Sequence, residues 1–318
     1  MANKQFTHQR VVVTGGAGFI GSNIVEEIIK NNEVMVIDDL STGKLENINN
    51  LINKHGGSFI NGDISNSALL ERTFQGVDIV FHEAAIANVA RSIDNPLLSN
   101  QVNIQGTLNV LTAARNNKVK KVVFASSAAI YGDTPVLPVK ENMIPDLQSP
   151  YALTKLTGEY YCRLFSQLYG LQTICLRYFN VYGPRQNPKS EYSAVIPSFI
   201  SNVLKNSPPI IYGDGTQTRD FVYVSDVVHA NIIAAETKAT GVFNIGSGTS
   251  TSINELAQNV LGIFSSSLQP VYKESKVGEV KNSLADLTRS NSIGYYPKHN
   301  LHYGLRETIA SIRSHHRY

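Results

Sequence analysis

The architecture of this 318-residue chain follows from one segment, Val11-Val12-Val13-Thr14-Gly15-Gly16-Ala17-Gly18-Phe19-Ile20-Gly21. Three consecutive valines indicate a buried strand, and the closely spaced glycines after them indicate a tight turn. Apolar residues then recur at helical spacing, at positions 20, 24, 25 and 28. The segment therefore predicts a strand, a glycine turn and a helix, the first unit of an alternating α/β fold.

Similar apolar runs follow at Glu33 to Asp38, Phe59-Ile60, Val77 to Phe81, Val122 to Ala125 and Thr173 to Leu176. Continuous apolar strands separated by helical stretches predict a Rossmann-like, doubly wound parallel sheet with helices on both faces. After residue 178 the chain breaks into shorter pieces punctuated by Pro and Gly, such as Tyr182-Gly183-Pro184-Arg185. We therefore expect a larger domain from residues 1–178, with a contribution from about 225–245, and a smaller C-terminal α/β substrate lobe from residues 179–318.

The glycine turn carries a second prediction. Gly15, Gly18 and Gly21 give the spacing G-x-x-G-x-x-G directly between a strand and a helix, where the backbone can approach a pyrophosphate and the helix N-terminus faces the anion. Asp38 ends the second strand, where a carboxylate accepts hydrogen bonds from ribose hydroxyls and repels a 2′-phosphate. The pattern predicts a dinucleotide site that prefers NAD to NADP.

Tyr151 and Lys155 are four residues apart, a spacing that places both side chains on one face of a helix. The ammonium favours the phenolate, so we expect the pKa of Tyr151 to move from its usual value of about 10 toward neutrality. A phenol of this kind can take a proton from an alcohol and return it. The pair is a candidate catalytic base.

Composition excludes several classes of protein. Hydrophobic residues make up 42% and charged residues 17%, which is typical of a soluble globular chain. The net charge of +3 is dispersed without a run of five Lys or Arg, so we expect no nucleic-acid partner. Cys162 and Cys175 have neither metal-ligand spacing nor the number needed for a disulfide framework. The N-terminus lacks the apolar core of a signal peptide, and no segment approaches the length of a membrane span. These features predict a cytoplasmic protein without membrane contact.

Together these motifs resemble the extended short-chain dehydrogenase/reductase superfamily, and within it the UDP-hexose 4-epimerase family. The glycine turn, Ser126-Ser127 after the fifth strand, and Tyr151-x-x-x-Lys155 occur in the order and at the spacing of the superfamily. The resemblance implies that Ser127 and Tyr151 meet at the reacting alcohol while Lys155 holds the nicotinamide ribose. It implies a cofactor site for NAD at Gly15, Gly18, Phe19, Ile20, Gly21, Asp38, Asp63, Ile64, Ala84, Ala85, Asn103, Tyr151 and Lys155.

The same resemblance implies a nucleoside diphosphate sugar as substrate. Arg219 would bind the diphosphate and Asn180 a phosphate or uracil-side group, while Lys276 stands where related enzymes carry an arginine. That departure weakens the case for a bidentate contact at position 276, since an ammonium is a point charge. The implied substrate-binding residues are Ala87, Asn88, Ser127, Asn180, Gln186, Ala194, Val195, Tyr212, Arg219, Lys276 and Ser283.

The residues after Ser127 favour one reaction. Related 4,6-dehydratases place Asp-Glu directly after the matching hydroxyl, and UDP-glucuronate decarboxylases keep a Glu at the position of Ala129. This chain has Ala128 and Ala129, which can neither donate nor accept a proton. One base and one hydride acceptor suffice for NAD-dependent 4-epimerisation through a 4-keto sugar. Ser283 matches a gate that is small in relatives accepting an acetamide, so UDP-glucose/galactose and UDP-N-acetylglucosamine/galactosamine are both expected substrates.

Two alternatives remain open from the sequence. One is another nucleotide-sugar enzyme of the family, namely a UDP-glucuronate epimerase or decarboxylase, a dehydratase or a reductase. The other is a non-catalytic NAD-binding regulator, which the presence of Ser127, Tyr151 and Lys155 disfavours. His82 and Glu83 end a strand without another metal ligand nearby, so we expect packing roles and no metal. A homodimer formed through a helix face is typical of the resembled family, with Tyr160 and Tyr161 as candidate packing or contact residues.

Overall fold

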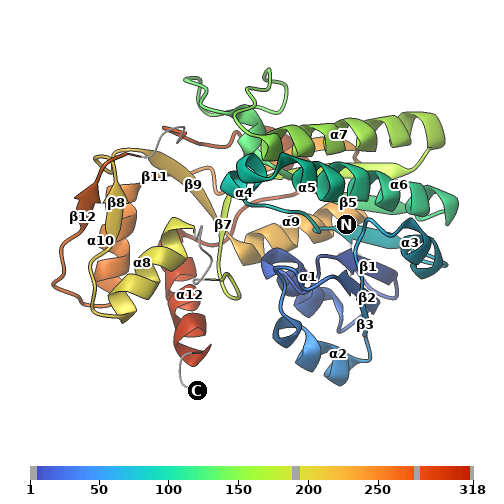
Figure 1. Ribbon diagram of the computed structural model, residues 1–318, viewed down its shortest axis with the longest axis horizontal. Helices are drawn as coiled ribbons and strands as arrows, with labels where there is room; N and C mark the ends of the chain where they lie inside the picture. Colours follow the sequence, from blue (N-terminus) through green and yellow to red (C-terminus); the bar gives the residue numbers. More distant parts are fainter. Residues whose placement is uncertain (1–5, 188–193, 276–279, 316–318) are drawn as a thin grey trace.

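The computed structural model describes residues 6–187, 194–275 and 280–315. Figure 1 shows a larger part built on one sheet and a smaller lobe beside it along the long axis of the molecule. The sheet has seven strands, all parallel, in the order β10-β6-β5-β4-β1-β2-β3. The strands are β1 (Arg10–Thr14), β2 (Glu33–Asp38), β3 (Ser58–Asn61), β4 (Ile79–His82), β5 (Lys121–Ser127), β6 (Gln172–Tyr178) and β10 (Gly241–Ile245).

Helices cover both faces of this sheet because its strands are apolar on both sides. One face packs against α1 (Phe19–Ile28), α2 (Asn49–His55) and α9 (Val224–Glu236). The other packs against α3 (Ser67–Thr73), α6 (Gly106–Asn116) and α7 (Pro150–Tyr169). The predicted Rossmann-like, doubly wound parallel sheet is confirmed.

Between β4 and α6 the chain forms short helices that lead to the carboxyl edge of the sheet. These are α4 (Val89–Asp94), α5 (Pro96–Asn100) and the π-helical turn Gln101–Gln105. A 3-10 turn at Ala128–Tyr131 follows β5. Figure 1 shows α4, α5, α6 and α7 on the same side of the larger part.

The smaller lobe holds two small sheets. One has the order β11-β9-β7, formed by β7 (Asn180–Tyr182), β9 (Thr218–Tyr223) and β11 (Ser250–Ser252), and the other pairs β8 (Ile210–Tyr212) with β12 (Val271–Lys273). Helices α8 (Val195–Leu204), α10 (Ile253–Ile263) and α12 (Leu301–His315) enclose a separate apolar core against them. The short α11 (Thr288–Ser292) lies against β10 instead. A smaller C-terminal lobe, as predicted, is present.

The two parts meet at the start of α1. Phe19, the first residue of that helix, packs against the core of the smaller lobe. Asn23 donates a hydrogen bond to the carbonyl of Pro184 at 3.2 Å, and Arg185 forms an ion pair with Glu26 at 2.7 Å. The loop after β7 is therefore anchored on the helix that follows the glycine turn.

Candidate active site

The glycine turn after β1 has a backbone that other residues could not adopt. Gly15 has a φ of +68°, and a Cβ at this position would lie 2.7 Å from the amide nitrogen of Ala84. A Cβ on Gly21 would overlap the carbonyl oxygen of Gly15. Gly18 caps α1 without any side-chain hydrogen bond, so the first amides of the helix remain available to an anion. This cradle fits a pyrophosphate.

Asp38 lies beside the cradle, at the carboxyl end of β2. Its carboxylate accepts the amide hydrogens of Ala17 at 3.0 Å and Leu40 at 2.8 Å, and the side chain is buried. Burial raises the pKa of Asp38, while these backbone hydrogen bonds lower it. A carboxylate can accept about four hydrogen bonds, so capacity remains for a ribose hydroxyl. The geometry fits the ribose contact that the sequence predicts.

The remaining predicted cofactor residues lie along the same carboxyl edge. Asp63 follows β3 and accepts the amide of Ser65 at 2.7 Å, and Ile64 is buried against Gly106. Ala84 and Ala85 follow β4, with the backbone of Ala84 directly against Gly15. Gly15 has no room for a Cβ here, because the turn and the end of β4 approach so closely. Together these residues could hold the adenosine half of NAD.

Ser127, Tyr151 and Lys155 come together where β5 ends and α7 begins. Tyr151 and Ser127 share a side-chain hydrogen bond. Lys155 donates to the carbonyl of Ala125 at 2.7 Å, and its Nζ lies 5.9 Å from the centre of the Tyr151 ring. Tyr151 and Lys155 are both buried. The three predicted catalytic side chains therefore form one cluster at the edge of the sheet.

The pKa of the Tyr151 phenol differs from the expectation drawn from the sequence. Burial raises the pKa of the Tyr151 phenol, the hydrogen bond with Ser127 lowers it, and the charge of Glu83 raises it. The expected fall toward neutrality is thus wrong for the protein alone. The reason is that the ring is enclosed by protein, and burial disfavours the charged phenolate. Lys155 is itself affected, since burial lowers its pKa to about 8.

The backbone of Tyr151 is held by residues that the sequence analysis missed. Ser92 of α4 accepts the amide hydrogen of Tyr151 at 3.1 Å and donates to the carbonyl of Val89 at 2.6 Å. Thr154 donates to the carbonyl of Tyr151 at 2.7 Å. No pattern in the sequence links α4 to α7, because the contact joins Ser92 to a residue 59 positions further along the chain and depends on the fold.

Asn103 extends this support to the loop after β4. Its side chain accepts the amide of Ile86 at 2.8 Å, and it donates to the carbonyl of Ile86 at 3.1 Å and to the hydroxyl of Thr154 at 3.0 Å. Asn103 lies in the π-helical turn Gln101–Gln105 and is buried. It therefore joins the loop that carries Ala84 and Ala85 to the helix that carries Tyr151.

His82 and Glu83 have different roles in the structure. His82 is buried, with Nδ1 2.8 Å from the Thr14 hydroxyl and Nε2 3.0 Å from the Thr107 hydroxyl, which agrees with the predicted packing role. Glu83 is not simply a packing residue. It accepts a hydrogen bond from the Tyr178 hydroxyl at 2.9 Å, and its charge acts on both Tyr151 and Lys155. The sequence did offer a signal for Glu83, because its carboxylate directly follows a buried strand and precedes the two alanines expected at the cofactor.

The smaller lobe places several predicted substrate residues along β7 and β9. Asn180 pairs with Phe221 in the parallel ladder between these strands. Arg219 donates to the carbonyls of Thr218 at 2.9 Å and Lys281 at 3.3 Å. Ser283 accepts the amide of Asp220 at 3.3 Å. Asn180 therefore lies on β7 and Arg219 on the neighbouring β9, and the segment that carries Ser283 is bonded to β9.

Asp220 secures this region from within. Its buried carboxylate accepts hydrogen bonds from the amides of Ser247, Gly248 and Ala285, at 2.6, 3.0 and 3.1 Å. On its other side, the segment that carries Ser283 bonds to the loop after β5, where Val139 donates to the carbonyl of Leu284 at 2.8 Å. The position of Ser283 is thus fixed from two directions.

The other predicted substrate residues are distributed around the junction of the lobes. Asn88 caps α4 by accepting the amide of Arg91 at 2.7 Å, directly after Ala87. Gln186 donates to the carbonyl of Val181 at 3.3 Å, while its buried Oε1 has no hydrogen-bond partner among the described residues. Ala194 and Val195 begin α8, and Tyr212 ends β8. Lys276 lies outside the described residues.

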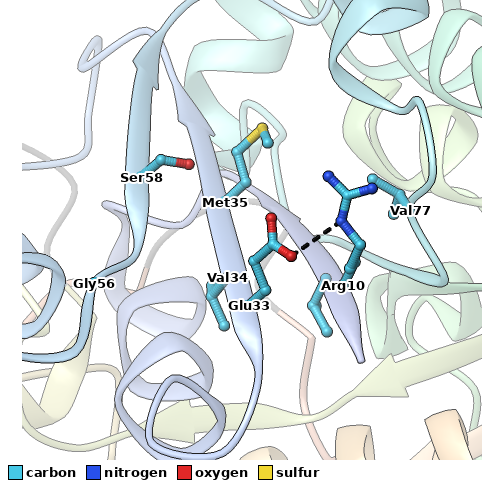
Figure 2. Close-up of a pocket in the computed structure, with 8 residues that line it drawn as sticks. Arg10, Glu33, Val34, Met35, Gly56, Ser58 and Val77 are labelled. Carbon is cyan, nitrogen blue, oxygen red and sulfur yellow. Dashed lines mark hydrogen bonds and ion pairs between the residues drawn. The ribbon is translucent and has the colours of Figure 1, made fainter. Parts of the chain in front are cut away.

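A hollow at the opposite edge of the sheet does not belong to this site. It has a volume of about 120 Å³ and lies at the amino ends of the strands, where Arg10 and Glu33 form an ion pair at 3.0 Å. Figure 2 shows that pair between the neighbouring strands β1 and β2, with Ser58 on the next strand. Ligand sites of parallel sheets form at the carboxyl ends and measure roughly 300–1,000 Å³, so this hollow is not a candidate.

Metal ligands do not gather in the part of the chain that the structure describes. Within residues 6–187, 194–275 and 280–315, no group of three or more His, Cys, Asp or Glu side chains could hold a metal ion. Among the helices in these ranges, none has both the length and the apolarity to cross a membrane. Cys162 and Cys175 are buried free thiols.

Comparison with known proteins identifies close relatives over nearly the whole chain. The family model described as the NAD dependent epimerase/dehydratase family matches residues 11–246. The chain is 42% identical over 310 residues to a putative UDP-glucose 4-epimerase of Methanocaldococcus jannaschii, covering 96% of this chain and 99% of that protein. The two proteins therefore align over nearly the full length of both chains.

Solved structures show the same similarity. The UDP-N-acetylglucosamine 4-epimerase of Methanobrevibacter ruminantium M1, in complex with UDP-N-acetylmuramic acid, has a TM-score of 0.95 and 44% identity, covering 97% of this chain and 99% of that one. The UDP-glucose 4-epimerase of Thermus thermophilus, in complex with NAD, has a TM-score of 0.88 and 37% identity, covering 96% of this chain and 99% of that one.

Proposed function

Because the chain belongs to the NAD-dependent epimerase/dehydratase family, we propose that this NAD-dependent enzyme inverts C4 of a UDP-sugar through a transient 4-keto sugar. The observation that carries the proposal is the cluster of Ser127, Tyr151 and Lys155 at the carboxyl edge, together with the two alanines after Ser127. The Methanocaldococcus and Methanobrevibacter relatives, both described as 4-epimerases, support the same reaction.

The chain's own residues supply the proton chemistry. Tyr151 takes the proton of the C4 hydroxyl and later returns it, while Ser127, hydrogen-bonded to Tyr151, orients the same hydroxyl. Lys155, held against the Ala125 carbonyl, supplies a positive charge near the phenol that favours its ionised form. A bound NAD would supply the acceptor for the C4 hydride and the donor for its return to the other face.

The two alanines after Ser127 disfavour elimination and decarboxylation. Ala128 and Ala129 begin the 3-10 turn after β5, and the amide of Ala129 donates to the Ser127 hydroxyl at 3.1 Å. Neither methyl group can act as an acid or a base. The chemistry left at this position needs one proton acceptor only, which is the requirement of 4-epimerisation.

The sugar range is the finer part of the proposal. We expect both UDP-glucose/galactose and UDP-N-acetylglucosamine/galactosamine to be accepted, because the gate residue Ser283 is small and its hydroxyl is bonded to the backbone of β9. A serine is smaller than the bulky gate of hexose-only relatives, so we expect room for an acetamide. The relatives support either sugar, since one is described as a UDP-glucose and another as a UDP-N-acetylglucosamine 4-epimerase.

A homodimer is also proposed, formed through the outer face of α7. That face carries exposed Leu153, Tyr160, Leu164 and Leu168, at a spacing that places them on one side of the helix. A contiguous apolar stripe of this kind on a folded domain marks an interaction surface.

The proposal is tested by incubating the purified protein separately with UDP-glucose and UDP-N-acetylglucosamine and following the anomeric protons by NMR. We expect the 4-epimer of each to accumulate without added reductant. Tyr151→Phe is the matched control and should abolish conversion while leaving the fold intact. Stoichiometric consumption of NAD(P)H would indicate a reductase and reject the reaction. Conversion of UDP-glucose alone would reject the gate argument.

A further inference from the structure

Glu83 follows β4, and its carboxylate is linked through Tyr178 to α9, on the face of the sheet opposite α7. Pairing between β4 and β5 sets His82 opposite Phe124, so Glu83 follows directly beside Ala125. The carbonyl of Ala125 accepts a hydrogen bond from the Lys155 ammonium at 2.7 Å. Neighbouring parallel strands are roughly 4.8 Å apart, so the backbone of Glu83 lies beside the carbonyl that binds Lys155.

The Glu83 carboxylate is held in place by two further residues. Its Oε1 accepts the hydroxyl hydrogen of Tyr178, the last residue of β6, at 2.9 Å. Asn231 of α9 in turn donates to the Tyr178 oxygen at 2.8 Å and to the Val227 carbonyl at 2.9 Å. Tyr178 and Asn231 are buried, while Glu83 is half-buried. The carboxylate therefore has a defined orientation.

The charges of Glu83 and Lys155 depend on each other. Burial raises the pKa of Glu83 to about 7, while the hydrogen bond from Tyr178 and the charge of Lys155 lower it. Burial lowers the pKa of Lys155 to about 8, and the charge of Glu83 acts against that shift. Each group thus favours the ionised form of the other in an enclosed environment.

Other groups near Lys155 do not supply the same charge. Glu159, on α7 itself, is already paired with Arg177 of β6 at 2.8 Å. His82 of β4 is neutral at physiological pH, because burial and then the charge of Lys155 lower its pKa to about 3. The remaining neighbours are the Cys162 thiol and the Tyr151 phenol. Glu83 differs from Glu159 because its hydrogen-bond partner, the Tyr178 hydroxyl, is neutral and leaves its charge available to Lys155.

We propose that Glu83 is a positioning residue, whose carboxylate, oriented by Tyr178, keeps Lys155 charged beside Tyr151. The inference deepens the proposed function, since it concerns the same centre. Without the carboxylate, the enclosed amine would lose its proton more readily, and both the support of Tyr151 and the contact of Lys155 with the cofactor ribose would weaken.

The test uses Glu83→Gln, which keeps the shape of the side chain and can still accept the Tyr178 hydrogen bond. The alkaline limb of log kcat/KM against pH should move to lower pH by about half a unit or more. Glu83→Asp keeps the charge and should return that limb to the wild-type position, even where overall activity is reduced. An alkaline limb at the same pH in wild type and Glu83→Gln would overturn the proposal.

A second readout does not need a sugar substrate. The affinity of the full-length protein for NADH can be followed by nicotinamide fluorescence across the same pH range, without background from tryptophan because the chain has none. The loss of affinity at high pH should begin about half a unit lower in Glu83→Gln than in wild type. A lower melting temperature with unchanged pH dependence would show a structural role only and reject the inference. Failure of UDP-sugar turnover would reject the proposed function but leave this measurement intact.

Discussion

At the residue scale, Tyr151 is fixed through its backbone as well as its hydroxyl. The Ser92 hydroxyl accepts the amide of Tyr151, and Thr154 donates to its carbonyl. We predict that Ser92→Ala lowers the free energy of unfolding by about 1–3 kcal/mol, because it leaves a buried amide unpaired. It should also lower kcat, since the first turn of α7 is no longer held against α4.

Ser99 provides a matched control for this change. It is as fully buried as Ser92, yet its hydroxyl has no hydrogen-bond partner among the described residues. Ser99→Ala should therefore be neutral or slightly stabilising. Urea unfolding of the two variants measures the difference, and equal losses of stability in both would contradict the role given to Ser92.

His82 predicts how stability depends on pH. Burial holds the folded-state pKa at about 3, against 6.5 in the unfolded chain. Below pH 6.5 the unfolded chain therefore binds a proton that the folded protein does not. This contribution to stability is present in full above pH 6.5, and about 1.4 kcal/mol is lost per pH unit as the pH falls toward 3.

His82→Gln, which cannot titrate, isolates this effect from the other acid-sensitive groups. The variant should be less stable than wild type at pH 7, because the hydrogen bonds to Thr14 and Thr107 are altered. Its deficit should shrink as the pH is lowered from about 6.5 to about 4.5. Denaturant unfolding at several pH values measures this, and parallel stability curves would show that His82 is not responsible.

At the element scale, the position of α7 on β5 depends on Gly158. A Cβ at this position would overlap the end of the buried Phe124 ring, and Lys155 lies over the same ring at 5.1 Å. We predict that Gly158→Ala destabilises the protein by about 1–3 kcal/mol through overpacking, despite a gain of about 1 kcal/mol in helix propensity. It should also reduce turnover, because Phe124 supports Lys155.

Gly262 of α10 is the matched control, since a Cβ there would meet no atom within 4 Å. Gly262→Ala should gain up to about 1 kcal/mol from helix propensity alone. Thermal unfolding of both variants tests the pair. If Gly158→Ala instead raised the stability of the protein, α7 could move away from Phe124 without loss of stability, and the prediction would be wrong.

The strands and the first βα unit were predictable because their signals are local. Apolar runs and a glycine turn report burial and backbone conformation within a few residues. The π-helical turn around Asn103 was not predictable, because it is stabilised by contacts with Ile86 and Thr154 from other elements. Tyr151 and Lys155 were found from spacing, whereas Glu83 gains its role only once β4, β6 and α9 are assembled. The direction of the Tyr151 pKa shift also required the burial of the ring, which spacing does not report.

At the scale of the whole molecule, the two lobes are joined at the predicted site. The glycine turn leads into α1, whose first residue packs against the smaller lobe, while Arg185 returns to pair with Glu26 of that helix. The segment that carries Ser283 bonds to the loop after β5 and to β9. The surfaces proposed for cofactor and sugar are therefore built from both lobes, so a change in their relative position would alter both.

The outer face of α7 predicts the assembly of the protein. Leu153, Tyr160, Leu164 and Leu168 are between 46% and 68% exposed, and Leu97 of the adjacent α5 is 83% exposed. Figure 1 shows α7 on the outside of the larger part, away from the smaller lobe's helices α8 and α12. A second copy of the chain would bury this stripe by a twofold, self-complementary contact.

We expect light scattering after size exclusion to give twice the chain mass for the wild type. The double variant Leu164→Glu, Leu168→Glu should elute as a monomer with an unchanged circular dichroism spectrum, because charges on the stripe would face each other across the twofold axis. Leu45→Glu is the control: this residue is 40% exposed and lies next to α2, on the other face of the sheet, so its charge should leave the dimer intact. A wild-type monomer at micromolar concentration, or a double variant that still dimerises, would place the interface elsewhere or remove it.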